Sequence, residues 1–85
     1  MLRISIGEII KQLSTYHPQI ELIAYKLDFD REIELKIGDT LVAWFVWKYA
    51  LVNKPRHKFL TKHFTDSEKK EMYEIVRKWD GEMRM

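Results

Sequence analysis

In residues 31–37, REIELKI, charged and apolar side chains alternate strictly from Glu32 to Ile37. Successive side chains of a β-strand point to opposite faces of its sheet, so this alternation predicts a strand with one buried and one solvated face. The buried face is expected to carry Ile33, Leu35 and Ile37, and the solvated face Glu32, Glu34 and Lys36. The rest of the chain must therefore supply apolar cover for one face of a sheet.

Two segments begin with the signature of a helix N-terminus. In a capping box, a hydroxyl side chain accepts a hydrogen bond from the backbone N–H three residues on, and a glutamate at that position accepts one in return. The first such pair is Ser5 with Glu8, and the second is Thr65 with Glu68. Both pairs precede or overlap apolar residues, so each predicts the start of an amphipathic helix.

The apolar residues of both segments recur at the spacing of a single helical face. In the first helix these residues are Ile6, Ile9, Ile10 and Leu13, and in the second they are Met72, Ile75, Val76 and Trp79. We expect the first helix to end before Pro18 and the second at Asp80-Gly81. Two amphipathic helices can therefore pack their apolar faces against the buried face of the sheet.

The segment before the alternating strand, residues 20–28, is largely apolar and is expected to pair with that strand as an antiparallel hairpin. A turn near Asp30 gives three apolar pairs: Ile23 with Ile37, Tyr25 with Leu35, and Leu27 with Ile33. The same register places Lys26 opposite Glu34, which is a favourable cross-strand pair. A slip of one residue would move Lys26 onto the buried face, so we prefer this register.

Residues 41–52 are apolar on every side except at Lys48, so their periodicity does not separate a helix from a strand. Their β-branched and aromatic side chains, and the Gly38-Asp39 turn before them, favour a third strand. With a two-residue loop, the buried face gains Val42, Trp44 and Val46. The solvated face gains an aromatic row, formed by Phe45, Trp47 and Tyr49.

Two alternatives to this assignment remain open. A four-residue loop gives the same faces, whereas a three-residue loop with a bulge buries Phe45 and Trp47 and exposes Val42, Trp44 and Val46 instead. Aromatic rows are also more often packed than displayed. In the second alternative, a helix or the segment after the strand covers the other face, and every aromatic side chain belongs to the core.

Together these elements predict an α+β fold in which residues 1–85 form a single compact domain. The expected order is helix, three strands, with or without a fourth strand within residues 57–64, and helix, with an antiparallel meander sheet and both helices on one face. The absence of cysteine argues against a disulfide scaffold and favours a cytoplasmic protein. The longest apolar run, residues 41–47, is shorter than the ~20 residues that span a bilayer, so no membrane segment is expected.

Positive charge is concentrated in the second half of the chain. Residues 48–63 contain no acid and five cations, which are Lys48, Lys54, Arg56, Lys58 and Lys62. Interleaved with histidine and phenylalanine, these cations resemble the mixture of charges and stacking rings that binds single-stranded nucleic acid. The alternative is a solvated hairpin, and the net charge of +2 is low for a nucleic-acid-binding domain.

The order helix, three strands, helix also occurs in double-stranded RNA-binding domains. Those domains carry a basic signature at the start of the last helix. Here Glu68 and Glu71 interrupt the cations at that place, so we assign the chain to no family.

Residues suited to catalysis or metal binding are sparse. On a strand through residues 57–64, His57 and His63 would lie roughly 20 Å apart at ~3.3 Å per residue, too far to share a metal ion. The acids of residues 28–34 are balanced by nearby lysines and fit a solvated face. The three glycines form no phosphate loop and no G-x-S-x-G motif. We expect no catalytic residue, no metal and no cofactor.

The sequence therefore predicts a non-catalytic binding protein, either an inhibitor or an adaptor, that docks on a protein or on a protein–nucleic acid assembly. The residues expected to bind the partner are Phe45, Trp47, Tyr49, Lys54, Arg56, Lys58 and Lys62. Two alternatives are direct binding of RNA or single-stranded DNA, and a homodimer through the sheet face. The size also suits the small inhibitors that phages and mobile elements carry.

Overall fold

The computed structural model describes residues 3–48 and 54–83. In chain order these residues form α1 (Ile6–Leu13), β1 (Ile20–Leu27), β2 (Asp30–Ile37), β3 (Thr40–Trp47), β4 (Arg56–Phe59) and α2 (Asp66–Val76). The strands form one antiparallel sheet in the order β1-β2-β3-β4, so each strand pairs with its neighbours in the chain. Neither described helix is long and apolar enough to cross a membrane.

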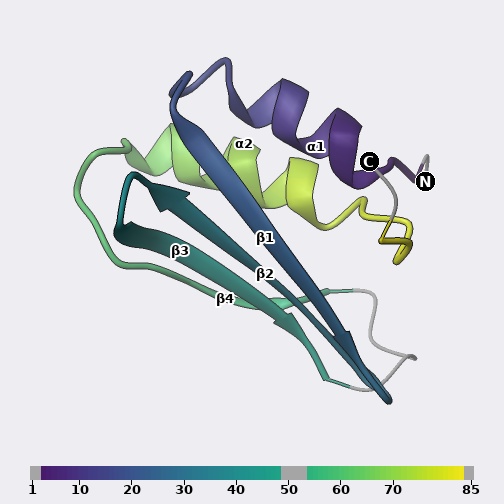
Figure 1. Ribbon diagram of the computed structural model, residues 1–85. Helices are drawn as coiled ribbons and strands as arrows, with labels where there is room; N and C mark the ends of the chain where they lie inside the picture. The colour runs from purple at the N-terminus through teal and green to yellow at the C-terminus, as the bar shows by residue number, and fades with distance from the viewer. Residues whose placement is uncertain (1–2, 49–53, 84–85) are drawn as a thin grey trace.

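Both helices lie side by side on one face of the sheet (Figure 1). The apolar stripes predicted for them face the core, which contains Ile6, Ile9 and Leu13 of α1 and Met72 and Val76 of α2. The expected α+β meander is confirmed, including the fourth strand. No described helix or strand lies on the opposite side of the sheet, which we call the open face.

The helices begin at the predicted N-caps. The Ser5 hydroxyl accepts a hydrogen bond from the backbone N–H of Glu8, whose carboxylate accepts another from the Gln12 side chain. At α2, Thr65 and Glu68 form the complete reciprocal capping box, with donor–acceptor distances of 3.2 and 2.9 Å. These bonds satisfy N–H groups that have no partner within the helix, and so they fix where each helix begins.

The second helix ends earlier than the sequence predicts. α2 stops at Val76, and Trp79 forms an isolated parallel β-bridge with Ile4. The backbone N–H of Ile4 donates to the carbonyl of Lys78 at 2.8 Å, and the N–H of Asp80 donates to the carbonyl of Ile4 at 2.9 Å. The two ends of the described chain are thereby joined (Figure 1), and the hydrogen bonds to Ile4 replace those of another helical turn.

The β1–β2 hairpin has a different register from the predicted one. A two-residue turn at residues 28–29 pairs Leu22 with Leu35. Asp28 opens this turn at φ +42°, in the left-handed region that aspartate tolerates better than most residues. The register differs from the prediction by an odd number of residues, so the side chains of β1 exchange faces. Three residues predicted in the core are therefore on the open face: Ile23, Tyr25 and Leu27.

A β-bulge interrupts the pairing of β2 with β3. The loop at residues 38–39 has two residues, as predicted, but the register then shifts, so that Leu35 pairs with Ala43 and Val42 is an extra residue. Val42 and Ala43 are both fully buried. The carbonyl of Val42 accepts a hydrogen bond from the backbone N–H of Leu60 at 2.9 Å, so this backbone group keeps a partner next to β4.

The bulge reverses the predicted faces of the following residues. Phe45 and Trp47, predicted on the solvated face, are fully buried under the helices. Trp44 and Val46, predicted in the core, lie on the open face and are partly exposed. The physical reason is that one inserted residue changes the phase of a two-residue repeat. The outcome matches the bulged alternative for these four residues, although Val42 stays buried.

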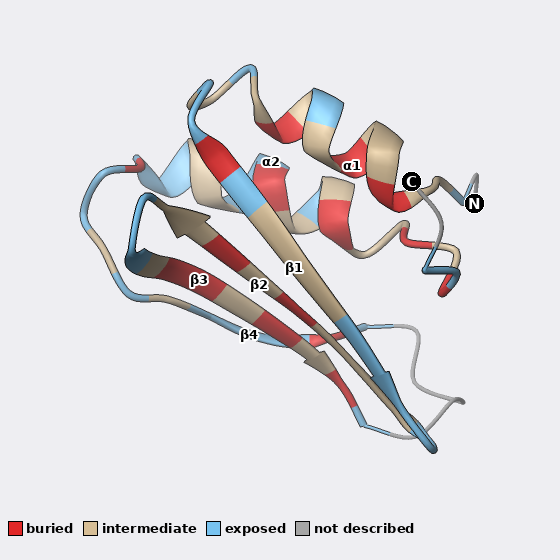
Figure 2. Cartoon of the chain, viewed as in Figure 1, coloured by how far each residue is buried: buried red, intermediate tan, exposed pale blue. Residues whose placement is uncertain are grey.

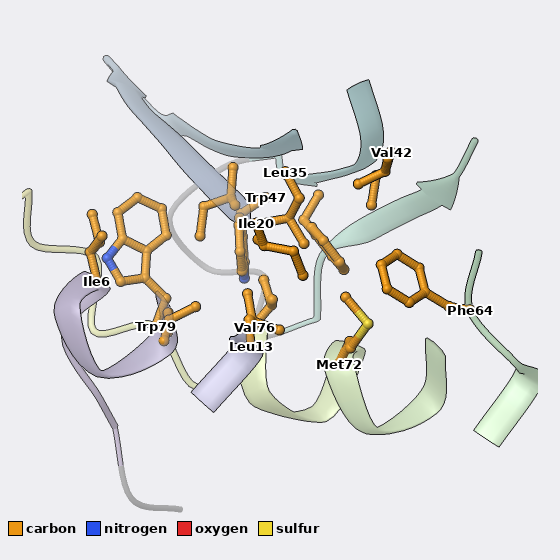
Figure 3. Packing of buried hydrophobic residues seen from close by; sticks show 14 residues of the cluster. Ile6, Leu13, Ile20, Leu35, Val42, Trp47, Phe64, Met72, Val76 and Trp79 are labelled. Atoms are coloured by element: carbon orange, nitrogen blue, oxygen red, sulfur yellow. The ribbon is translucent and has the colours of Figure 1, made fainter. Parts of the chain in front are cut away.

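Aromatic rings fill the space between the sheet and the helices. Trp47 packs edge-on against Trp79, with ring centroids 5.4 Å apart. Phe45 contacts Phe59 of β4 at 5.8 Å, and Phe59 contacts Phe64 at 6.3 Å. Figure 3 shows Trp79 at one end of this core and Phe64 at the other. Burial of these rings stabilises the bulged register, because any other phase would expose them.

Arg31 closes the end of the core at which the chain termini meet. Its guanidinium lies 5.2 Å from the ring centre of Trp47 and 5.4 Å from that of Trp79. Partial burial, followed by the charge of Arg3, lowers the pKa of Arg31. Gly81, at φ +84°, lies so close that an added Cβ would be 2.7 Å from Arg31 Nη1. The positive φ therefore favours a glycine here, and a larger residue would also have to displace the end of the Arg31 side chain.

Truncation of the two tryptophans of β3 tests the bulged register. Trp47→Ala removes a fully buried side chain and is expected to lower the free energy of unfolding by about 3–5 kcal/mol. Trp44→Ala, on the open face, is expected to lower it by about 1 kcal/mol or less. Urea unfolding followed by circular dichroism measures both values. A larger loss for Trp44→Ala than for Trp47→Ala would contradict the register.

Candidate functional site

The open face presents one column of side chains from each strand. β1 contributes the apolar column Ile23, Tyr25 and Leu27, preceded by Glu21, and β2 contributes the acidic column Asp30, Glu32 and Glu34, followed by Lys36. β3 contributes Trp44 and Val46, and β4 contributes Arg56 and Lys58. Figure 2 shows that the end of β1 next to the β1–β2 turn and most of β4 are exposed. Apolar and charged columns therefore alternate across the face, with the acids near the middle and the cations at the β4 edge.

The strand register aligns these columns into rows. One row consists of Ile23, Glu34, Trp44 and Lys58, and the next of Tyr25, Glu32, Val46 and Arg56. The predicted pairing of Lys26 with Glu34 is wrong, because Ile23 takes that place. In each row a β3 side chain stands between an acid and a cation whose strands are roughly 10 Å apart. Opposite charges thus flank the apolar side chains on both sides.

Two further electrostatic contacts lie at one end of this surface. Lys48 and Asp30 form an ion pair at 3.9 Å that is open to solvent and therefore weak. Tyr25 lies beside the acidic column: the charge of Glu34 raises the pKa of Tyr25, with smaller contributions from burial, from a hydrogen bond with Glu34 and from Glu32. At neutral pH the phenol is protonated and therefore uncharged beside the acidic column.

Two shallow hollows lie on the open face. The first measures about 250 Å³ and is lined by Glu32, Glu34, Leu41, Trp44 and Val46. The second measures about 260 Å³ and extends towards Tyr25, Leu27 and Lys48. Sites for small molecules usually enclose their ligand in roughly 300–1,000 Å³. These hollows are smaller and open, which suits single side chains of a macromolecule.

The structure separates the predicted partner-binding residues into three groups. Phe45 and Trp47 are only 0% and 1% exposed, so the prediction that they form an accessible row is wrong. Their burial follows from the bulge, which turns them towards the helices. Tyr49 lies outside the described residues. The remaining predicted residues are cations, and all of them are exposed: Lys54, Arg56, Lys58 and Lys62.

These cations do not form one cluster. Arg56 and Lys58 belong to β4 and lie on the open face, opposite Val46 and Trp44. Lys54 precedes this strand, and Lys62 follows it in the connection to α2. The four cations are therefore spread along one edge of the sheet, and only Arg56 and Lys58 adjoin the partly exposed Trp44.

Trp44 and Tyr25 lie on the surface, whereas their sequence pattern predicted that both are buried. For Tyr25 a signal was present, because Asp28 is suited to the first position of a two-residue turn, and that turn sets the observed register. For Trp44 no such signal exists. Residues 41–47 are apolar on both faces, so their pattern is the same with and without a bulge.

His57 and His63 do not lie on one strand, contrary to the expectation of a strand through residues 57–64. β4 ends at Phe59, so His63 lies in the following connection. His57 is on the helix side of the sheet, stacked on Phe45 at 6.0 Å and 4.5 Å from the ring of Tyr73. The described residues contain no group of three or more acids and histidines that could hold a metal ion.

Comparison of the chain with protein-family models, with curated proteins and with solved structures finds no match. The role of the open face is therefore argued from its own side chains.

The ionisation of Tyr25 tests the arrangement of β1 and β2. Tyr25 is expected to titrate above its usual pKa of 10.0, and Glu34→Gln should lower this pKa, because the largest cause of the shift is removed. The folded chain holds this proton more tightly than the unfolded chain, so the free energy of unfolding should also fall as pH rises above about 10. NMR of ¹³C-labelled tyrosine rings resolves the individual side chains.

The control for this titration is Glu21→Gln, which removes an exposed acid from the same strand and should leave the Tyr25 pKa unchanged. A Tyr25 pKa that does not respond to Glu34→Gln would contradict the observed register.

Proposed function

We propose that this protein is a non-catalytic binding domain, an inhibitor or an adaptor, that docks on another protein through the open face. The observation that carries the proposal is a sheet face without helical cover, on which Trp44 and Tyr25 stand among charged columns. Contacts between proteins commonly combine an aromatic centre with a charged rim, and tryptophan, tyrosine and arginine are enriched in them.

Exposed apolar side chains gather at one end of this surface. Leu27 is 69% exposed, Phe29 in the adjoining turn 72%, and Tyr25 41%. Removal of apolar area from water contributes ~25 cal/mol per Å², so a partner that covers this end gains affinity there. The charged columns then determine which partner fits and in which orientation.

The distribution of charge favours a protein over a nucleic acid. Affinity for nucleic acid depends on several cations that contact phosphates together. On the open face the cations Lys36, Lys48, Arg56 and Lys58 are matched by the carboxylates of Glu21, Asp30, Glu32 and Glu34, so positive charge does not dominate. A phosphate backbone that crossed the sheet would meet this acidic column and be repelled.

The shape of the surface supports docking without a chemical step. Catalytic sites hold their substrate in a pocket that excludes water. The two hollows of the open face are shallow and share the half-buried side chains of Glu32 and Val46. A domain of this kind acts by covering a site on its partner or by holding two proteins together.

Capture of a protein partner tests the proposal. Proteins retained from an extract of the source cells by the immobilised wild-type chain are purified, and their affinities are measured by calorimetry. Trp44→Asp and Tyr25→Asp are each expected to weaken binding at least tenfold, since both place a charge in the apolar columns. Lys11→Asp, on the exposed side of α1, is the control and should bind normally. A partner that binds all four chains equally would contradict docking at the open face.

Fluorescence anisotropy of labelled single-stranded DNA, duplex DNA and RNA examines the alternative. We expect no tight binding at about 50 or about 200 mM salt, the range over which phosphate-driven affinity changes most. Tight binding that falls steeply with salt and disappears in the Arg56→Glu, Lys58→Glu double variant would replace the proposal with a nucleic-acid-binding function.

A further inference from the structure

The geometry points to a second copy of this chain as an occupant of the open face, packed across a two-fold axis that runs along β3. This inference rests on the proposed function, because it requires the open face to be a docking surface. It is carried by the order of the four columns, which is apolar, acidic, apolar and basic from β1 to β4. Rotation about β3 sets the charged columns against columns of opposite charge.

The two-fold rotation places β2 of one copy over β4 of the other. Glu34 and Lys58 share a row, so Glu34 of each copy faces Lys58 of the second copy. In the next row Glu32 faces Arg56 of the second copy in the same way. Both contacts occur twice by symmetry, as in any isologous interface, and they lie on both sides of the axis.

Trp44 and Val46 lie on the axis itself. Each would pack against the same residue of the second copy, since β3 lies over β3. Trp44 is flanked in its row by Glu34 and Lys58. Burial of the paired indoles removes water from the centre of the contact, and this strengthens the flanking ion pairs.

Charge disfavours two other two-fold arrangements of the same faces. An axis across the strands sets each strand over its own counterpart, so the acids of β2 meet acids and the cations of β4 meet cations. An axis along β2 sets β2 of one copy over β2 of the other, so acids again face acids. Stacked sheets are rotated by about 30°, which displaces facing side chains one strand from the axis by roughly 2.5 Å, within the reach of lysine and arginine.

The contact is small. Only β2, β3 and β4 overlap fully, and at ~4.8 Å between strands they cover roughly 15 Å by 20 Å. An area of roughly 300 Å² per copy is smaller than stable protein interfaces bury and fits only a weak, transient contact. We therefore infer a reversible dimer that forms at high protein concentration and that a different partner displaces from the same surface.

Sedimentation equilibrium with charge-swap variants tests this arrangement. The wild-type mass is expected to rise from 10.4 kDa towards twice that value between about 10 µM and about 1 mM protein. Glu34→Lys and Lys58→Glu should each weaken association at least tenfold, because like charges then face each other. An equimolar mixture of the two variants should associate again, because the lysines of one chain face the glutamates of the other.

Glu21→Lys is the matched control, since it makes the same charge change on β1, outside the contact, and should associate as the wild type does. Circular dichroism verifies that every variant is folded. A wild-type chain that stays monomeric up to about 1 mM would overturn the inference. So would single variants that associate normally, or a mixture that does not associate.

Failure of the dimer and failure of the docking function give different results. A monomeric wild-type chain whose captured partner is lost with Trp44→Asp would overturn the dimer and leave the docking function in place. A dimer that follows the charge-swap pattern, combined with a captured partner that binds Trp44→Asp normally, would support the dimer and overturn docking of that partner at the open face.

Discussion

The extra residue in β3, Val42, reverses the two faces of the strand after it, and both sides of the molecule depend on this reversal. On the helix side, Phe45 and Trp47 become buried and contact rings from β4 and from the C-terminal segment. On the open side, Trp44 takes its place between Glu34 and Lys58. A regular strand would put Trp44 in the core and Phe45 and Trp47 on the open face, so the ring contacts of the core and the place of Trp44 between Glu34 and Lys58 would both be lost.

The open face combines exposed apolar area with a means of restricting what it contacts. An uncovered apolar sheet surface invites unspecific association. Here charged columns stand next to the apolar ones, so close contact is favourable only with a surface whose charges match. Arg56 and Lys58 also mark the short edge strand β4, where charge discourages the addition of a further strand.

The proposed dimer and the proposed partner use the same side chains and therefore compete. A weak dimer would cover Trp44 while the chain is abundant and free of partner, which shields the apolar centre of the open face from other contacts. A partner with higher affinity would shift the equilibrium to the monomer by mass action. Protein concentration and partner affinity together would then decide which complex is present.

The sequence by itself determined where both helices begin, their apolar stripes, and the two faces of β2, because these features are encoded by spacing within short segments. For β3 it only favoured a strand over a helix, and it left β4 optional. It also marked the exposed cations Arg56 and Lys58. Only the tertiary structure decided the register of β1 and the phase of β3. Residues 41–47 are apolar on both sides, so the choice between Trp44 and Trp47 for the core depends on which rings fill the space between the sheet and two helices.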